Sequence, residues 1–417
     1  MRAMLRPSLR LMAVLALGGT LGGGCGKAAS TPSSGAAGAA PASASSAVVS
    51  VATKNTTRLA GRDPASTAAA VALAVYPGLT PATRPAAVVL VNERDWPASL
   101  VASALASAPL GAPLLYADGD SLPADSARAL RAMRPIGAAS LQGAQVIRIA
   151  TAAPVPDGYR AQTVPRVGGA SPEGTAELAG AVQRLLATAA NGNPGEVIAL
   201  ATNAPQALQM PATALAAESG APILTLTTTG VPASTASILE GLRRPAIYVV
   251  GAGALSSRAL TELARYGRVK SVAGGAGGGS SHAGENLNPV QNAISVSRFA
   301  DGAFGWGIHE AGHGLVFANM ADPLYAPAAA ALSSHGDYGP LLLLESSASL
   351  PPPLAEYLSD IEPGYTNAIR PVREVYNHGW LLGDERSISA VAQAEVDALL
   401  EIAPRTSAQE PSVSPPE

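Results

Sequence analysis

The chain has 417 residues, of which 47% are hydrophobic and 14% are charged. This length exceeds that of one ordinary domain, and the apolar fraction is sufficient for real hydrophobic cores, which excludes a fibrous or disordered protein. The formal net charge of −3 excludes a general attraction to nucleic acid, so we expect no nucleic-acid partner.

The amino end predicts an exported protein. A basic segment precedes an apolar run over 11–21, which has the length of a signal-peptide core and is too short to span a bilayer. Three glycines and Cys25, the single cysteine of the chain, follow this run. The arrangement resembles a bacterial lipobox. We therefore expect residues 1–25 to be a lipoprotein signal peptide and Cys25 to attach the chain to the outer face of the cell membrane through a lipid.

Low-complexity segments flank the predicted folded part. Residues 26–54 are rich in Ala, Ser, Gly and Pro and predict a disordered tether that would hold the folded part off the membrane. Residues 403–417 contain four prolines and predict a disordered tail.

Between these segments one pattern recurs three times. It begins with a continuously apolar strand, such as 86–92, continues through an Ala/Leu-rich helix and reaches a second strand that a proline opens. The distance from the end of the first strand to this proline is 21, 20 and 21 residues, measured from Asn92 to Pro113, Thr202 to Pro222 and Asn319 to Pro340. Strands this apolar are typical of parallel sheets that are buried on both faces.

The repeats predict an α/β protein. A second helix and a third strand follow in each copy, so strands and helices alternate and form right-handed βαβ units. We predict three tandem Rossmann-like or flavodoxin-like parallel-sheet modules over 55–160, 161–275 and 276–402. Three similar copies commonly close around an axis, so we expect a pseudo-threefold arrangement.

An arginine stands near the start of each copy, before an apolar residue and a turn of small residues. These arginines are Arg58, Arg166 and Arg298. Guanidinium groups bind anionic groups through charge-assisted hydrogen bonds, so all three are candidate ligand contacts. The alternative is that each arginine holds neighbouring backbone carbonyls.

A second group of candidates lies in the third copy. His309 and His313 belong to a H-E-x-x-H segment, which on a helix would bind zinc and leave Glu310 to activate water. Glycines surround this segment and a strand follows at once, so we predict a loop-to-strand junction. In that interpretation Trp306, His309 and His313 line a polar or carbohydrate-binding groove where loops meet strand ends. The alternative is a structural turn held by histidine hydrogen bonds.

Motifs for cofactors are incomplete. The segment 251–253 follows a strand but lacks the third glycine of a dinucleotide fingerprint, and the glycine run 274–279 lacks the lysine of a P-loop. We therefore expect no cofactor and no resident metal.

Several segments together resemble the cell wall-binding repeat 2 family. They are the RLAGRD opening at Arg58, the GAPLL strand, the Leu-Pro turn and the late VVGAGALSS segment, and the resemblance covers 55–402. In that family three repeats form a triangle of Rossmann-like modules that anchors surface proteins to anionic wall polymers. The resemblance implies a non-catalytic envelope protein that binds an anionic cell-wall glycopolymer.

Two alternatives to glycopolymer binding remain open. A lipid-anchored receptor for a small solute would hold its ligand in a cleft between modules, and a zinc hydrolase would use the H-E-x-x-H segment. The sequence does not assign an oligomeric state.

Overall fold

The computed structural model describes residues 50–272, 288–336, 338–365 and 376–404, which belong to one compact unit. The predicted signal peptide, Cys25, the glycine run and most of the tether and tail lie outside the described residues. At the two borders the chain is ordered for slightly longer than predicted: β1 (Ser50–Ala52) and β17 (Ala403–Pro404) are strands.

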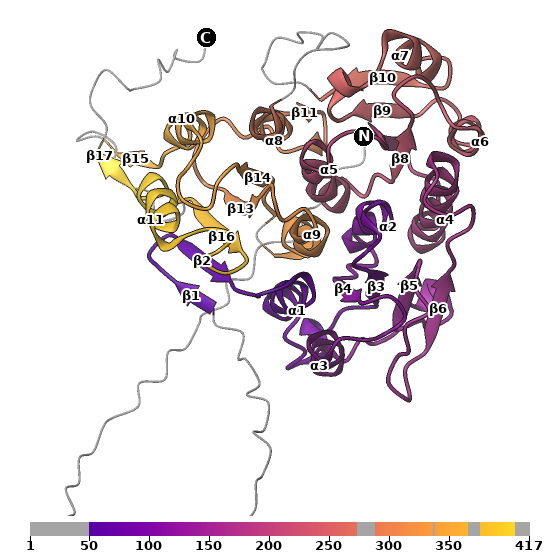
Figure 1. The fold of residues 1–417 in the computed structure, drawn as a ribbon, viewed down its shortest axis with the longest axis horizontal. Coiled ribbons are helices and arrows are strands. Elements are labelled where there is room, and N and C mark those ends of the chain that lie inside the picture. The colour runs from indigo at the N-terminus through magenta and orange to yellow at the C-terminus, as the bar shows by residue number, and fades with distance from the viewer. Residues whose placement is uncertain (1–49, 273–287, 337, 366–375, 405–417) are drawn as a thin grey trace, which may run out of the picture. The chain divides into compact units, whose positions relative to one another are not determined.

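Three parallel sheets carry the fold (Figure 1). Sheet 1 contains β3 (Val88–Asn92), β4 (Leu114–Ala117), β5 (Val146–Ile149) and β6 (Ala161–Val164), in the order β4-β3-β5-β6. Sheet 2 contains β7 (Glu196–Ala201), β8 (Ile223–Leu226), β9 (Ala246–Val249) and β10 (Arg268–Ser271), in the order β8-β7-β9-β10. Sheet 3 contains β13 (Gly314–Asn319), β14 (Leu341–Leu344), β16 (His378–Leu382) and β2 (Thr56–Leu59), in the order β14-β13-β16-β2, and β1 adds an antiparallel edge to β2.

The three sheets share one strand order. In each, the first strand of the repeat lies between the second and the third, and a fourth strand follows the third. This is the order of flavodoxin-like sheets. The prediction of an α/β fold with three tandem parallel-sheet modules is therefore confirmed.

Helices cover both faces of the sheets. The helices between strands are α2 (Trp96–Ala102) with the 3₁₀ turn η2 (Ser103–Ala106), α3 (Ala124–Met133), α5 (Gln206–Ser219), α6 (Ala233–Gly241), α7 (Ser257–Leu263), α9 (Tyr325–His335), α10 (Pro352–Asp360) and, near the carboxyl end, α11 (Ala390–Leu399). Three further helices follow the fourth strand of a sheet and lead into the next repeat: α1 (Pro64–Val75), α4 (Pro172–Ala190) and α8 (Pro289–Arg298).

The three connecting helices start in the same way. Each has proline in its first turn, where the missing N–H costs no hydrogen bond. The side chains of Asp63, Ser171 and Asn288 stand before these prolines and accept backbone N–H groups of the first turn. This shared start makes positions along the three helices directly comparable.

The sheets are offset from the sequence repeats by one strand. Strand β6 opens the predicted copy 161–275 but pairs with β5 of sheet 1, and β2 pairs with β16 of sheet 3, with Leu59 beside Leu382. Figure 1 shows the indigo β2 next to the yellow β16. The connecting helices explain the offset, because α4 contacts α2 on sheet 1 as well as β8 and α6 of the next module. The modules are therefore interlocked, and the start of the described chain completes the last sheet.

Equivalent helices of the three repeats meet. The turn η2 and helices α5 and α9 contact one another pairwise, and Ala106, Ala217 and Ala330 form a buried cluster among them. Alanine at each of these positions lets the backbones approach closely. Contact among equivalent elements of all three repeats agrees with the expected pseudo-threefold arrangement.

Among the described helices, none is both long and apolar enough to cross a membrane.

Candidate functional site at the carboxyl edge of sheet 3

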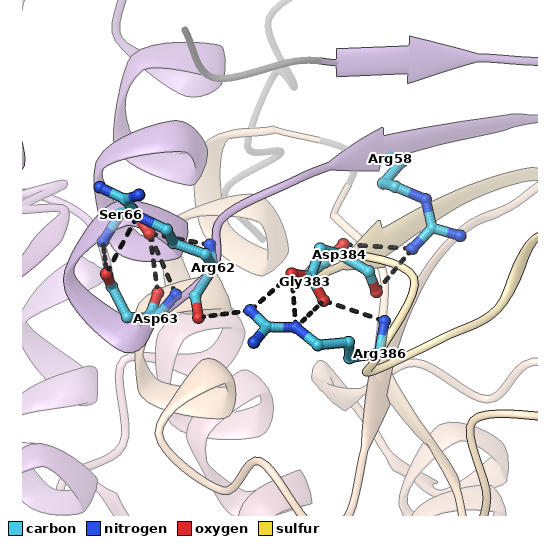
Figure 2. Close-up of polar contacts among 7 residues, drawn as sticks. All are labelled: Arg58, Arg62, Asp63, Ser66, Gly383, Asp384 and Arg386. Carbon is cyan, nitrogen blue, oxygen red and sulfur yellow. Dashed lines mark hydrogen bonds and ion pairs between the residues drawn. The ribbon is translucent and has the colours of Figure 1, made fainter. Parts of the chain in front are cut away.

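Arg58, the first predicted ligand contact, lies on β2 and is buried, with 3% of the residue exposed. Its Nε and Nη2 atoms donate to Oε1 of Gln393 at 3.0 and 2.8 Å. Its Nη1 atom donates to the carbonyl oxygens of Gly383 and Asp384, each at 3.1 Å (Figure 2). Its Nη2 atom also donates to the Ser389 carbonyl at 3.5 Å. All its donors are used inside the protein, so Arg58 holds a turn and is not accessible to a ligand.

Arg166 and Arg298 occupy two other environments. Arg166 follows β6, and its Nε atom lies 3.0 Å from Oδ2 of Asp95; both side chains are 14% exposed. Arg298 ends α8, pairs with Asp360 and lies 5.0 Å from the ring centre of Tyr357. The structure does not bring the three predicted arginines together, and each already has partners within the chain.

The H-E-x-x-H segment is irregular backbone that leads into β13. Because it is not helical, His309 and His313 do not share the face of a helix. His309 is exposed, and burial lowers the pKa of the partly buried His313, whereas Glu310 raises it. No group of three His, Cys, Asp or Glu side chains in the described part of the chain is placed to hold a metal.

The residues of the predicted groove lie before the first strand of sheet 3. His309, His313 and Trp306 precede β13, so they lie at the amino edge of sheet 3, whereas open α/β sheets bind ligands at the carboxyl edge. The indole N–H of Trp306 donates to the Tyr338 carbonyl at 2.7 Å. This bond fixes the ring against the loop before β14.

The carboxyl edge of sheet 3 carries a different set of groups (Figure 2). Arg386 forms a two-pronged contact with Asp384, with Nε–Oδ2 at 2.9 Å and Nη2–Oδ2 at 2.7 Å, and also donates to the Arg62 carbonyl at 3.0 Å. Arg62 and Asp63 follow β2, and Asp63 accepts the Ser66 N–H at 2.7 Å as the cap of α1. Pairing of β2 with β16 therefore brings the two ends of the described chain into one cluster.

This cluster continues onto the carboxyl edge of sheet 1. Arg94 follows β3 and forms an ion pair with Asp118, which follows β4 (Nη2–Oδ1 2.5 Å). Burial raises the pKa of Glu93, and the nearby carboxylates of Asp118 and Asp63 raise it further. Asp63 belongs to the cap of α1, so Glu93 on sheet 1 lies within electrostatic range of the carboxyl edge of sheet 3. We call these residues the carboxyl-edge cluster: Arg62, Asp63, Glu93, Arg94, Asp118, Asp384 and Arg386.

The carboxyl-edge cluster contains both guanidinium and carboxylate groups, which lie next to each other. The hydrogen bonds from Arg386 lower the pKa of Asp384, so this carboxylate stays ionised. The side chains of Arg62, Arg94 and Arg386 are 65%, 71% and 74% exposed, so their remaining donors face solvent. The cluster therefore presents exposed donors and acceptors side by side, without an excess of positive charge.

The sequence contained a partial signal for this cluster. The RLAGRD opening includes Arg62 and Asp63, and Gly383-Asp384 follows the third strand of the last repeat. The prediction selected Arg58 from that opening instead of Arg62. On a strand, adjacent side chains alternate between faces, and Arg58 points toward α11, where Gln393 lies.

The fold and this site define a protein built from three interlocked flavodoxin-like modules with a polar cluster at one sheet edge. The structure is similar to that of Cwp6 from Clostridium difficile, with a TM-score of 0.60 and 18% sequence identity; the match covers 86% of this chain and 50% of Cwp6. It is also similar to Cwp8 from Clostridium difficile, with a TM-score of 0.58 and 18% identity; that match covers 84% of this chain and 52% of Cwp8. The chain thus spans about half the length of each, and at this identity the likeness concerns the fold. No family model and no curated protein sequence matches the chain.

Proposed function

We propose that this protein is a non-catalytic component of the cell envelope that binds a glycopolymer of the cell wall. Two observations support the proposal. Cwp6 and Cwp8, which share the fold, are cell wall proteins. The exposed carboxyl-edge cluster lies where open α/β sheets bind ligands, and it is the observation that carries the proposal.

The chemistry of the carboxyl-edge cluster suits saccharide hydroxyl groups. A hydroxyl both donates and accepts, so it can bridge a guanidinium and a neighbouring carboxylate through charge-assisted bonds. Arg62, Arg94 and Arg386 replace the three buried or partnered arginines as the proposed contacts. The three guanidinium groups are offered to the anionic groups of a wall polymer, and the carboxylates accept hydrogen bonds from its hydroxyl groups.

The proposal includes three points that rest on sequence patterns. They are membership of the cell wall-binding repeat 2 family, export by the predicted signal peptide, and lipid attachment at Cys25 to the outer face of the membrane. Together they would keep the protein at the inner side of the wall.

The test is binding of the purified full chain to isolated cell walls, with and without chemical removal of their anionic polymers. We expect binding to be lost on removal, and the combined change Arg62→Gln, Arg94→Gln and Arg386→Gln to weaken binding about tenfold or more. Arg128→Gln is the matched control, because Arg128 is another exposed arginine paired with a carboxylate, Asp125.

Two outcomes would contradict the proposal. The first is the absence of binding to either wall preparation. The second is equal loss of binding in the control and in the triple variant, because the carboxyl-edge cluster would then have no special role.

A further inference from the structure

A groove of about 670 Å³ lies between α4 and α6, next to the end of β6. Its volume is in the range of small-ligand sites. Leu178, Ile238 and Leu242 supply apolar walls, and Glu177 and Arg184 supply charges. The groove is distant in sequence from the carboxyl-edge cluster and shares no residue with it.

Glycines shape this groove. A Cβ atom on Gly180 would lie 2.8 Å from Cδ1 of Ile238, so α4 and α6 approach closely where they cross. A Cβ atom on Gly241 would meet nothing within 4 Å, so the space beside the end of α6 is open. The helices are therefore in close contact at one point and leave room beyond it.

The first repeat shows that this groove is not a general feature of the modules. Counted from the cap residues Asp63 and Ser171, the positions of Glu177 and Arg184 correspond to Ala69 on α1 and to Tyr76, the residue that follows this helix. Both of these residues are buried against α3 in a hydrophobic cluster. In the second repeat the same two positions are exposed and carry opposite charges, which face the groove instead of a packed helix.

Glu177 and Arg184 are seven residues apart on α4 and both line the groove. Neither side chain forms a hydrogen bond or an ion pair with another described residue; the carbonyl of Arg184 accepts from the Thr188 hydroxyl at 2.8 Å. Seven residues of α-helix span about 10.5 Å. An extended tripeptide has a similar length, about 10 Å.

We propose that the groove between α4 and α6 binds a short apolar peptide of three or four residues with free amino and carboxyl ends. Glu177 accepts the terminal ammonium group and Arg184 binds the terminal carboxylate, each through a charge-assisted bond. Small apolar side chains of the peptide pack against Leu178, Ile238 and Leu242. The two opposite charges at this spacing select a zwitterion of defined length over a singly charged solute.

The test is calorimetric titration of the purified full chain with trialanine. We expect saturable binding that weakens about tenfold or more in Glu177→Gln and in Arg184→Gln. Trialanine with acetylated and amidated ends should not bind, because it lacks both charges. Arg131→Gln is the matched control, since Arg131 is an exposed arginine on α3, the helix of the first repeat that corresponds to α6.

A second variant tests the location. Ser237 is exposed on α6 and lines the groove, so Ser237→Trp should fill it and abolish binding while the melting temperature stays within a few degrees of the unchanged protein. Absence of saturable binding by trialanine would overturn the proposal. Equal binding of the capped peptide, or undiminished binding by Ser237→Trp, would do the same.

Discussion

Arg58 and Arg166 stand in similar sequence contexts, yet they stabilise the protein in different ways. Arg58 is fully buried and holds a turn of the carboxyl-terminal segment through five hydrogen bonds. Arg166 is partly buried and has one ion pair, with Asp95. Sheet 3 is completed by β2, a strand from the other end of the described chain. No short connection joins β2 to β16, so the side-chain hydrogen bonds of Arg58 help to hold the two strands together.

The largest expected effect is at Arg58. Replacing it by alanine leaves Oε1 of Gln393 and the carbonyls of Gly383 and Asp384 without their Arg58 donors, so Arg58→Ala should lower the free energy of unfolding by about 3–5 kcal/mol. Urea unfolding followed by circular dichroism measures this change. The neighbouring exposed Arg62→Ala serves as the control, and a loss below about 1 kcal/mol for Arg58→Ala would show that sheet 3 does not depend on this contact.

Glu218, near the end of α5, offers a test of how the stability of the protein depends on pH. Burial raises the pKa of Glu218 on α5 to about 7, and the carboxylate of Glu196 contributes to the rise. The folded protein therefore binds a proton more tightly than the unfolded chain, and stability should fall as pH rises from about 4.5 to 7.

Glu218→Gln removes this titration. The variant should be more stable than the unchanged protein by about 1–3 kcal/mol at pH 8 and equal to it near pH 4, as measured by urea unfolding at both pH values. Equal stabilisation at both pH values would mean that the effect does not come from ionisation of Glu218.

Arg166 should matter less than Arg58. We expect Arg166→Gln to cost about 1–2 kcal/mol, because one partly buried ion pair is lost. A double-mutant cycle with Asp95→Asn isolates the pair, and the two single changes should not be additive. If the cycle gives no coupling, the 3.0 Å contact adds nothing to stability.

The smallest stability effect should be at Arg386. Its side chain is 74% exposed, so Arg386→Gln should change the free energy of unfolding by no more than about 0.5 kcal/mol. The same variant should weaken binding to cell walls. A large loss of stability would instead assign Arg386 a structural role like that of Arg58.

Much of the fold could be predicted from local sequence. Continuous apolar runs and the regular spacing of Pro113, Pro222 and Pro340 predicted the strands, the helices between them and the three parallel-sheet modules. The strand order could not be obtained in this way, because the partner of β2 lies more than 300 residues away and no local pattern identifies it.

The candidate site was less predictable for related reasons. The carboxyl-edge cluster combines residues 62–63 with residues 384–386, and only the pairing of β2 with β16 brings them together. The edge of the sheet at which His309 and His313 lie, in contrast, can be predicted from their place in the sequence, directly before β13. They precede a parallel strand, and residues that precede such strands lie at the amino edge of the sheet.

The antiparallel strand β1 also decides from which side the chain enters the fold. Residue 50 pairs with Leu59, at the end of β2 that leads into Arg62. The polypeptide thus arrives on the same side as the carboxyl-edge cluster. A ligand held by this cluster would lie close to the point where the preceding segment joins the fold. Under the proposal that Cys25 carries a lipid, the length of that segment would set how far from the membrane the protein can reach such a ligand.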